Sequence, residues 1–152
     1  LYIAEKENWN YGRLKDMINK ESGVLGITGI SSDMRDIENA EANGNQRAAL
    51  ALDIYHQRMK KYVGGYAAEM GGVDMIVFTG GVGENGPETR EAVCGGMEFM
   101  GVDFDRDANA GVRGKDKVLS SPGSKVKVVV ATTNEELVIA SDTYRLLKAR
   151  SE

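Results

Sequence analysis

The chain has 152 residues, 41% of them hydrophobic, and a net charge of −4, which is ordinary for one soluble globular domain. Its basic residues are scattered, which argues against nucleic acid as a partner, and no apolar run approaches the roughly 20 residues needed to cross a membrane. Cys94 is the only cysteine, which excludes an intrachain disulfide and favours a reducing, cytoplasmic setting. His56 is the only histidine, so a multi-ligand Cys/His metal site is excluded as well.

Short helical signals open the chain. Residues Leu14–Asn19 predict a short helix, and the glycine-punctuated segment Gly23–Gly29 predicts a loop. Asp33 is the predicted N-cap of a second short helix over Met34–Ala40.

A long amphipathic helix follows over Gln46–Met70, where apolar residues recur at spacings of three and four. We expect Gly64-Gly65 to weaken its last part and Gly71-Gly72 to end it. Its stripe of tyrosine and methionine is interpreted as core or subunit contact.

The second half of the chain favours an α/β fold. Val73–Thr79 is a short apolar run typical of a buried strand. Pro87 suits the first turn of a helix that runs to about Gly95 or Met100. Val118–Ser120 and Lys125–Ala131 predict two strands joined by a turn.

The last predicted element is a helix through Leu147. Thr133 and Glu136 have the spacing of a capping box at its start. Because Glu136 has the spacing of the capping partner, Glu135 is left free for other chemistry.

The segment Gly80–Asn85 directly follows the first predicted strand. A strand that ends in glycines and leads into a helix exposes backbone N–H groups where a phosphate could rest. The spacing Gly81-x-Gly83-x-x-Gly86 also matches a dinucleotide-binding motif, with Asp103 or Asp105 about 20 residues later. We favour phosphoryl transfer over this alternative, because Met97–Val102 is a poor second strand. No Gly-Lys-Ser or Gly-Lys-Thr follows, which excludes a Walker A loop.

Three segments, in the same order, resemble motifs of the acetate kinase family: Ile27–Arg35, Val77–Asn85 and Thr133–Leu137. The resemblance implies an actin-like, sugar-kinase-like ATPase fold, which is ribonuclease H-like. Since the chain starts at Leu1 rather than Met, we expect residues 1–152 to be a partial C-terminal nucleotide-binding domain whose N-terminal partner domain is absent.

The resemblance also implies the site. Asp33, Met34 and Arg35 would contact adenosine, with the Arg35 guanidinium against the purine. Five consecutive residues would approach the phosphates: Gly81, Val82, Gly83, Glu84 and Asn85. Asn85 would make a polar contact, cap the next helix, or do both. Glu135 matches the family's magnesium-associated glutamate, and Mg²⁺ prefers oxygen ligands.

The function implied by the resemblance is the reversible ATP-dependent phosphorylation of acetate to acetyl phosphate. This chain would supply the ATP/ADP and Mg²⁺ side, while the catalytic groups and the carboxylate pocket would lie in the missing part. A homodimer is implied as well. The alternatives are a propionate or butyrate kinase, and a non-enzymatic module that binds nucleotide or forms a dimer.

Overall fold

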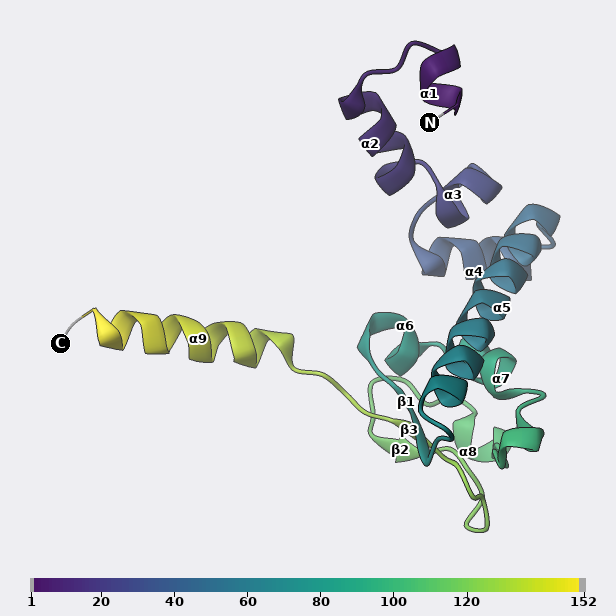
Figure 1. Ribbon diagram of the computed structural model, residues 1–152. Helices are drawn as coiled ribbons and strands as arrows, with labels where there is room; N and C mark the ends of the chain where they lie inside the picture. The colour runs from purple at the N-terminus through teal and green to yellow at the C-terminus, as the bar shows by residue number, and fades with distance from the viewer. Residues whose placement is uncertain (1, 151–152) are drawn as a thin grey trace. The chain divides into compact units, whose positions relative to one another are not determined.

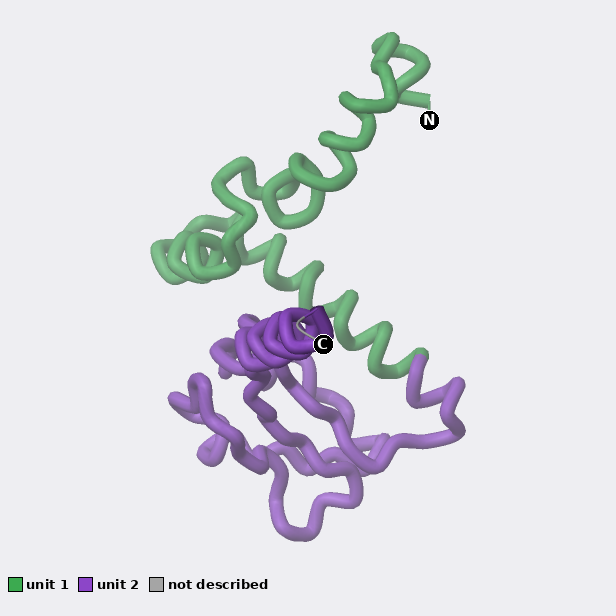
Figure 2. The backbone as a smooth tube through the Cα atoms, turned by 90° about the vertical axis from the view of Figure 1, so that its left-hand side faces the viewer, with its two compact units in different colours: residues 1–65 green, residues 66–152 purple. Residues whose placement is uncertain are grey.

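The computed structural model describes residues 2–150 and forms two compact units, which meet in sequence between Gly65 and Tyr66 (Figure 2). The predicted domain span also includes Leu1, Ser151 and Glu152, which lie outside the described residues. Among the described helices, none combines the length and apolarity that a membrane span requires.

Between residues 2 and 65, the first unit contains helices but no strands (Figure 1). Its helices are α1 (Tyr2–Lys6), α2 (Tyr11–Lys20), α3 (Gly23–Thr28), α4 (Met34–Ala42) and most of α5 (Gln46–Glu69). The short helices predicted around Leu14–Asn19 and Met34–Ala40 are confirmed. Its core is a small apolar cluster of buried residues from α4 and α5: Ile37, Ala48, Ala51 and Leu52.

The loop predicted over Gly23–Gly29 is wrong, because Gly23–Thr28 forms helix α3. Glycine there marks a close approach of the backbone: a Cβ on Gly26 would lie 2.9 Å from the carbonyl oxygen of Glu21. The turn comes only at Gly29, whose φ of 69° is left-handed and ends the helix.

The long helix α5 is confirmed, and it continues without interruption through Gly64 and Gly65. At its C-terminus the N–H of Gly72 donates to Ala67 and that of Gly71 to Ala68, with Gly71 at a φ of 72°. This pattern is a Schellman cap, which glycine makes possible. The predicted stripe is buried at Ala48 and Leu52 but exposed towards its C-terminal end, at Tyr62, Tyr66 and Met70.

The second unit contains a three-stranded sheet with the order β1-β3-β2. Strand β1 (Met75–Phe78) pairs in parallel with β3 (Lys127–Val130), and β2 (Lys117–Val118) pairs antiparallel with β3. The three strands were all predicted, although β2 is shorter than the sequence suggests. Burial alternates along β1 and β3, so one face of these strands forms the core through four buried side chains: Ile76, Phe78, Val128 and Val130.

The helices of this unit are α6 (Gly80–Asn85), α7 (Pro87–Cys94), the 3₁₀-helix η1 (Glu98–Met100), α8 (Arg106–Asn109) and α9 (Glu135–Ala149). Pro87 occupies the first turn of α7 as predicted. Met97–Val102 contains η1 in place of a second βαβ strand, which removes the structural context that the dinucleotide motif requires.

Candidate functional site at the carboxyl edge of the sheet

The carboxyl ends of β1 and β3 meet at one edge of the sheet. The two strands are parallel neighbours, and the N–H of Ala131 continues their ladder by donating to Phe78 over 3.0 Å. Strand β1 leads into α6, while β3 leads through Thr132 and Thr133 into α9. Ligands of α/β sheets bind outside the carboxyl ends of the strands, so this edge is the candidate site in the second unit.

The glycines of α6 have different structural roles. The left-handed position is Gly80, with a φ of 68°. At Gly83, a Cβ would lie 3.1 Å from the carbonyl carbon of Phe78, whereas nothing lies within 4 Å of a Cβ on Gly81. Gly83 is therefore required for packing of α6 on β1, and Gly81 is the glycine with open space beside its backbone.

This difference gives a paired prediction. Gly83→Ala should destabilise the protein by about 1–3 kcal/mol, because the backbone of a buried strand cannot easily move away from the new methyl group. Gly81→Ala should leave the free energy of unfolding unchanged or slightly higher, since alanine favours a helix. If Gly81 also lies beside the nucleotide, only its variant should lower nucleotide affinity without loss of stability. Urea unfolding and ATP kinetics of the two variants distinguish these outcomes, and equal destabilisation by both would contradict the assignment.

The carboxylate of Glu84 connects α6 to the start of α9. Its Oε1 atom accepts from the N–H of Gly80, the N–H of Thr133 and the hydroxyl of Thr133, each at 2.9 Å. The hydrogen bonds from Thr133 and Gly80 lower the pKa of Glu84 below its ordinary value. This stabilisation is present above the ordinary glutamate pKa and is lost as the pH falls through the lower pKa of the folded state. The N–H of Gly80 is thus already used within the protein.

The predicted capping box at Thr133 is wrong, because the hydroxyl of Thr133 bonds to Glu84. The N-cap of α9 is Asn134, whose side chain accepts from the N–H of Leu137 at 2.9 Å. Asparagine is as good an N-cap as threonine or better. Because Asn134 caps α9, the hydroxyl of Thr133 is available for its bond to Glu84. Glu136 is consequently not the partner of a capping threonine.

Asn85 does not cap the next helix, contrary to one of its two predicted roles. The N-cap position of α7 is Gly86, without a side-chain bond, and the Asn85 amide donates to the carbonyl of Gly81 at 3.0 Å. Arg113 donates to the Asn85 carbonyl. Asn85 therefore helps to close the single turn of α6, and its predicted polar contact with a nucleotide stays a prediction.

Arg90 is a site-supporting residue that the sequence reasoning missed. Its side chain is 0% exposed and donates to the carbonyl of Gly83 at 2.7 Å, the carbonyl of Val112 at 2.6 Å and Oδ1 of Asn109 at 2.8 Å. Burial lowers its pKa. The signal was available, since Arg90 shares a helical face with Val93 and Cys94 at spacings of three and four. Through its bond to the carbonyl of Gly83, Arg90 holds the C-terminal part of α6 in place.

Asp33, Met34 and Arg35 lie in the first unit, at the start of α4. Asp33 is the predicted N-cap, which is confirmed: it accepts from the N–H of Arg35 at 3.0 Å. Its carboxylate also pairs with the Arg35 guanidinium at 2.6 Å, and these hydrogen bonds lower the pKa of Asp33 to about 2. The Arg35 side chain remains 84% exposed. That these residues share a nucleotide surface with Gly81–Asn85 remains a prediction.

Glu135 is the first residue of α9 and is exposed. Its carboxylate fits the usual protein contribution to a Mg²⁺ site, which is one or two carboxylates completed by phosphate oxygens and water. Among residues 2–150, no three histidine, cysteine, aspartate or glutamate side chains gather as a metal-binding group.

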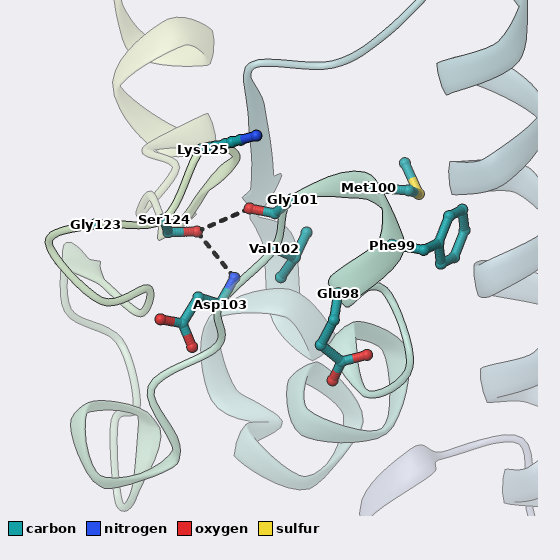
Figure 3. Close-up of a pocket in the computed structure, with 9 residues that line it drawn as sticks. All are labelled: Glu98, Phe99, Met100, Gly101, Val102, Asp103, Gly123, Ser124 and Lys125. Atoms are coloured by element: carbon teal, nitrogen blue, oxygen red, sulfur yellow. Dashed lines mark hydrogen bonds between the residues drawn. The ribbon is translucent and has the colours of Figure 1, made fainter.

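A separate pocket of about 450 Å³ lies at the opposite end of the strands. Figure 3 shows Ser124 at its wall, where the hydroxyl bonds to the N–H of Asp103 and the carbonyl of Gly101. The carbonyl of Gly101 also accepts from the N–H of Val126, the residue just before β3 begins. The pocket is a product of turn packing at the amino edge of the sheet, where ligands of α/β folds do not normally bind.

Solved structures share this fold. The crystal structure of Porphyromonas gingivalis acetate kinase matches 96% of the chain with a TM-score of 0.88 and 57% sequence identity, and the match covers 37% of that protein. A propionate kinase from Francisella tularensis matches 91% of the chain with a TM-score of 0.80 and 34% identity, covering 35% of that protein. The predicted class is confirmed: this is part of an actin-like α/β ATPase domain.

Sequence comparison identifies the family. The chain is 58% identical to the acetate kinases of Porphyromonas gingivalis and Bacteroides thetaiotaomicron over 147 residues, which is 97% of this chain and 37% of each relative. The model of the acetokinase family matches residues 1–141. The chain belongs to the acetokinase family, and it spans less than two-fifths of the length of the curated relatives that it matches.

Proposed function

We propose that this chain supplies the ATP and Mg²⁺ side of the site in an acetate kinase, which phosphorylates acetate reversibly to acetyl phosphate. The observation that carries the proposal is the carboxyl edge of the sheet: the glycine turn α6 and the segment that bears Glu135 meet there, in a chain 58% identical to acetate kinases. Phosphoryl transfer depends chiefly on positioning and on neutralising charge. This edge would supply the positioning, and a Mg²⁺ ion held by Glu135 would neutralise charge.

The nucleotide would lie along two segments of the chain. Gly81, Val82, Gly83, Glu84 and Asn85 would approach its phosphates, with Gly81 providing the open space. Asp33, Met34 and Arg35 would contact its adenosine. The exposed guanidinium of Arg35 is held in one orientation by Asp33, which suits stacking on a purine.

The adenosine role predicts a selective kinetic effect. In the intact protein, Arg35→Ala should raise the KM for ATP more than the KM for acetate, since the lost contact is with the nucleotide alone. Steady-state kinetics with each substrate varied in turn measures this, and equal changes in both constants would argue against the role.

A Mg²⁺ ion bound with the nucleotide would draw charge from the transferred phosphoryl group. Glu135 would hold it through its carboxylate. Asn134 fixes the start of α9, so Glu135 stands at a defined point beside the segment that Glu84 binds.

Glu135 and Glu136 are neighbours in the first turn of α9, and they form a matched pair for a test. Glu135→Ala should lower turnover and raise the Mg²⁺ concentration needed for half-maximal rate by at least about 10-fold, as expected for loss of a metal ligand. Glu136→Ala should change only helix stability, by less than about 1 kcal/mol. Mg²⁺ titration together with thermal melting would show whether the metal has been assigned to the wrong glutamate.

A propionate kinase is the second candidate, favoured by the match to the Francisella tularensis enzyme. Acyl-chain choice belongs to the carboxylate pocket, for which this chain has no assigned residues. Hydroxamate assays of the intact protein with acetate, propionate and butyrate would decide between them by the ratio of kcat/KM values. A protein that binds ADP but phosphorylates none of the three would be the non-enzymatic module.

We also propose a homodimer and a cytoplasmic location. The exposed Tyr62, Tyr66 and Met70 on α5 support a contact beyond this chain, and the single, buried cysteine, Cys94, suits a reducing compartment. Sedimentation of the intact protein as a monomer would refute the dimer.

A further inference from the structure

We propose that Glu84 is a positioning residue that couples the glycine turn α6 to the segment bearing Glu135, so that the phosphate and metal sides of the site are held as one unit. The proposal rests on the proposed function for its consequence, but the coupling itself is a property of the ligand-free protein. It follows from the hydrogen-bond partners of Glu84 and from the geometry of residues 131–134.

The segment between β3 and α9 has no regular structure to hold it. Residues 131–134 belong to neither a strand nor a helix, so their backbone donors must bond elsewhere. Two carboxylates provide for this in the same way. Asp116 accepts from the N–H and the hydroxyl of Thr132, both at 2.7 Å, and Glu84 accepts from the N–H and the hydroxyl of Thr133.

The two carboxylates differ in what else they bind. Asp116 lies next to β2, and its bonds fix the segment only to the rim of the sheet. Glu84 simultaneously accepts from the N–H of Gly80 at the start of α6, and its own carbonyl accepts from Gly114 at 3.2 Å. A displacement of α6 is therefore transmitted directly to Thr133, two residues before Glu135.

The strength of this link follows from charge. Both Glu84 and Asp116 have a pKa below the ordinary value because of these hydrogen bonds, so both carboxylates are ionised at neutral pH. Hydrogen bonds to an ionised acceptor are roughly twice as strong as neutral ones. Residues that orient a metal ligand without touching the metal typically change metal affinity or activity by 10–100-fold when removed.

The first test uses the intact protein without nucleotide. In Glu84→Ala, the amide hydrogens of both Gly80 and Thr133 should exchange at least about 10-fold faster than in the parent, because one acceptor protects both. Thr132→Val is the matched control, since it removes a hydroxyl from the same segment but leaves α6 untouched; there Gly80 should keep its protection. If only one of the two amide hydrogens exchanges faster in Glu84→Ala and the other keeps its protection, the coupling is absent, whatever the protein's activity.

The second test reads the consequence for the site. Glu84→Ala should raise both the KM for ATP and the half-saturating Mg²⁺ concentration by roughly 10-fold, and Thr133→Val should raise both by less, with Thr133→Ser close to the parent. The double variant Glu84→Ala/Thr133→Val should be no worse than Glu84→Ala alone, because the two side chains act through one contact. Thr132→Val should leave the half-saturating Mg²⁺ concentration unchanged. Additive effects, or a Mg²⁺ requirement that stays normal in Glu84→Ala, would overturn the proposal, whereas failure of the parent to use ATP would overturn only the proposed function.

Discussion

The 152-residue chain by itself is expected to form acetyl phosphate at a rate at least on the order of 10³ below that of the intact protein. The chain spans 37% of the length of the curated relative that it matches, and the residues that we propose within it serve the nucleotide and the metal, with none proposed for the carboxylate. Removing even one preorganised charge from a phosphoryl-transfer site can cost about 10³ in rate. The chain alone should also bind ADP more weakly than the intact protein does. A nucleotide bound on an open surface stays hydrated, and water weakens its electrostatic contacts with the protein.

A hydroxamate assay of the purified chain with acetate, ATP and Mg²⁺ measures this rate directly. The intact protein, assayed in the same buffer, is the positive control. Mass spectrometry of the sample should exclude a copurified second fragment. Acetyl phosphate formed at the rate of a complete kinase would show that catalytic groups lie within this chain and have been overlooked.

Arg90→Ala is expected to destabilise the intact protein by at least about 3 kcal/mol. The guanidinium satisfies three buried acceptors, on Gly83, Val112 and Asn109. Each acceptor left without a donor costs about 1–3 kcal/mol, and the missing side chain would add a cavity. For a domain of this size the loss corresponds to a melting temperature lower by roughly 6–12 °C.

Arg90→Lys separates geometry from charge in the same experiment. Lysine keeps the positive charge but cannot reproduce the planar arrangement of donors, so it should restore only part of the lost stability. Arg106→Ala is the control on a nearby exposed ion pair with Glu91, at 3.1 Å, and should change stability by less than about 1 kcal/mol. If Arg90→Ala melts within a degree of the parent, the three hydrogen bonds do not hold α6 in place.

The elements with a regular local pattern could be predicted from the sequence. The three-and-four spacing over Gln46–Met70 predicted α5, and the apolar run before Gly80 predicted β1. Asp33 was identified as an N-cap because its side chain acts on residues two positions away. These features depend on neighbours in sequence, so the sequence alone contains the necessary information.

The errors concern groups with more than one available partner. Thr133 could cap α9 or bond to Glu84, 49 residues away, and only the fold brings Glu84 within reach. Gly26 looked like a loop residue, although its missing side chain makes room for Glu21. The three hydrogen bonds of Arg90 could not be foreseen either, because they require the fold to bring Asn109 and Val112 next to α7. Long-range pairing decides the cases of Thr133 and Arg90, and local spacing carries no record of it.

The parallel pairing of β1 with β3 also sets an order of events during synthesis. Met75 pairs with Lys127, about 50 residues further along the chain, and at 5–20 residues per second the ribosome needs roughly 3–10 s to make that distance. Until then β1 is an apolar strand without its partner, and an unpaired strand of this kind readily joins another chain. The carboxyl edge of the sheet therefore forms late. A nascent chain is most exposed to aggregation during the seconds in which the two strands of this candidate site are still unpaired.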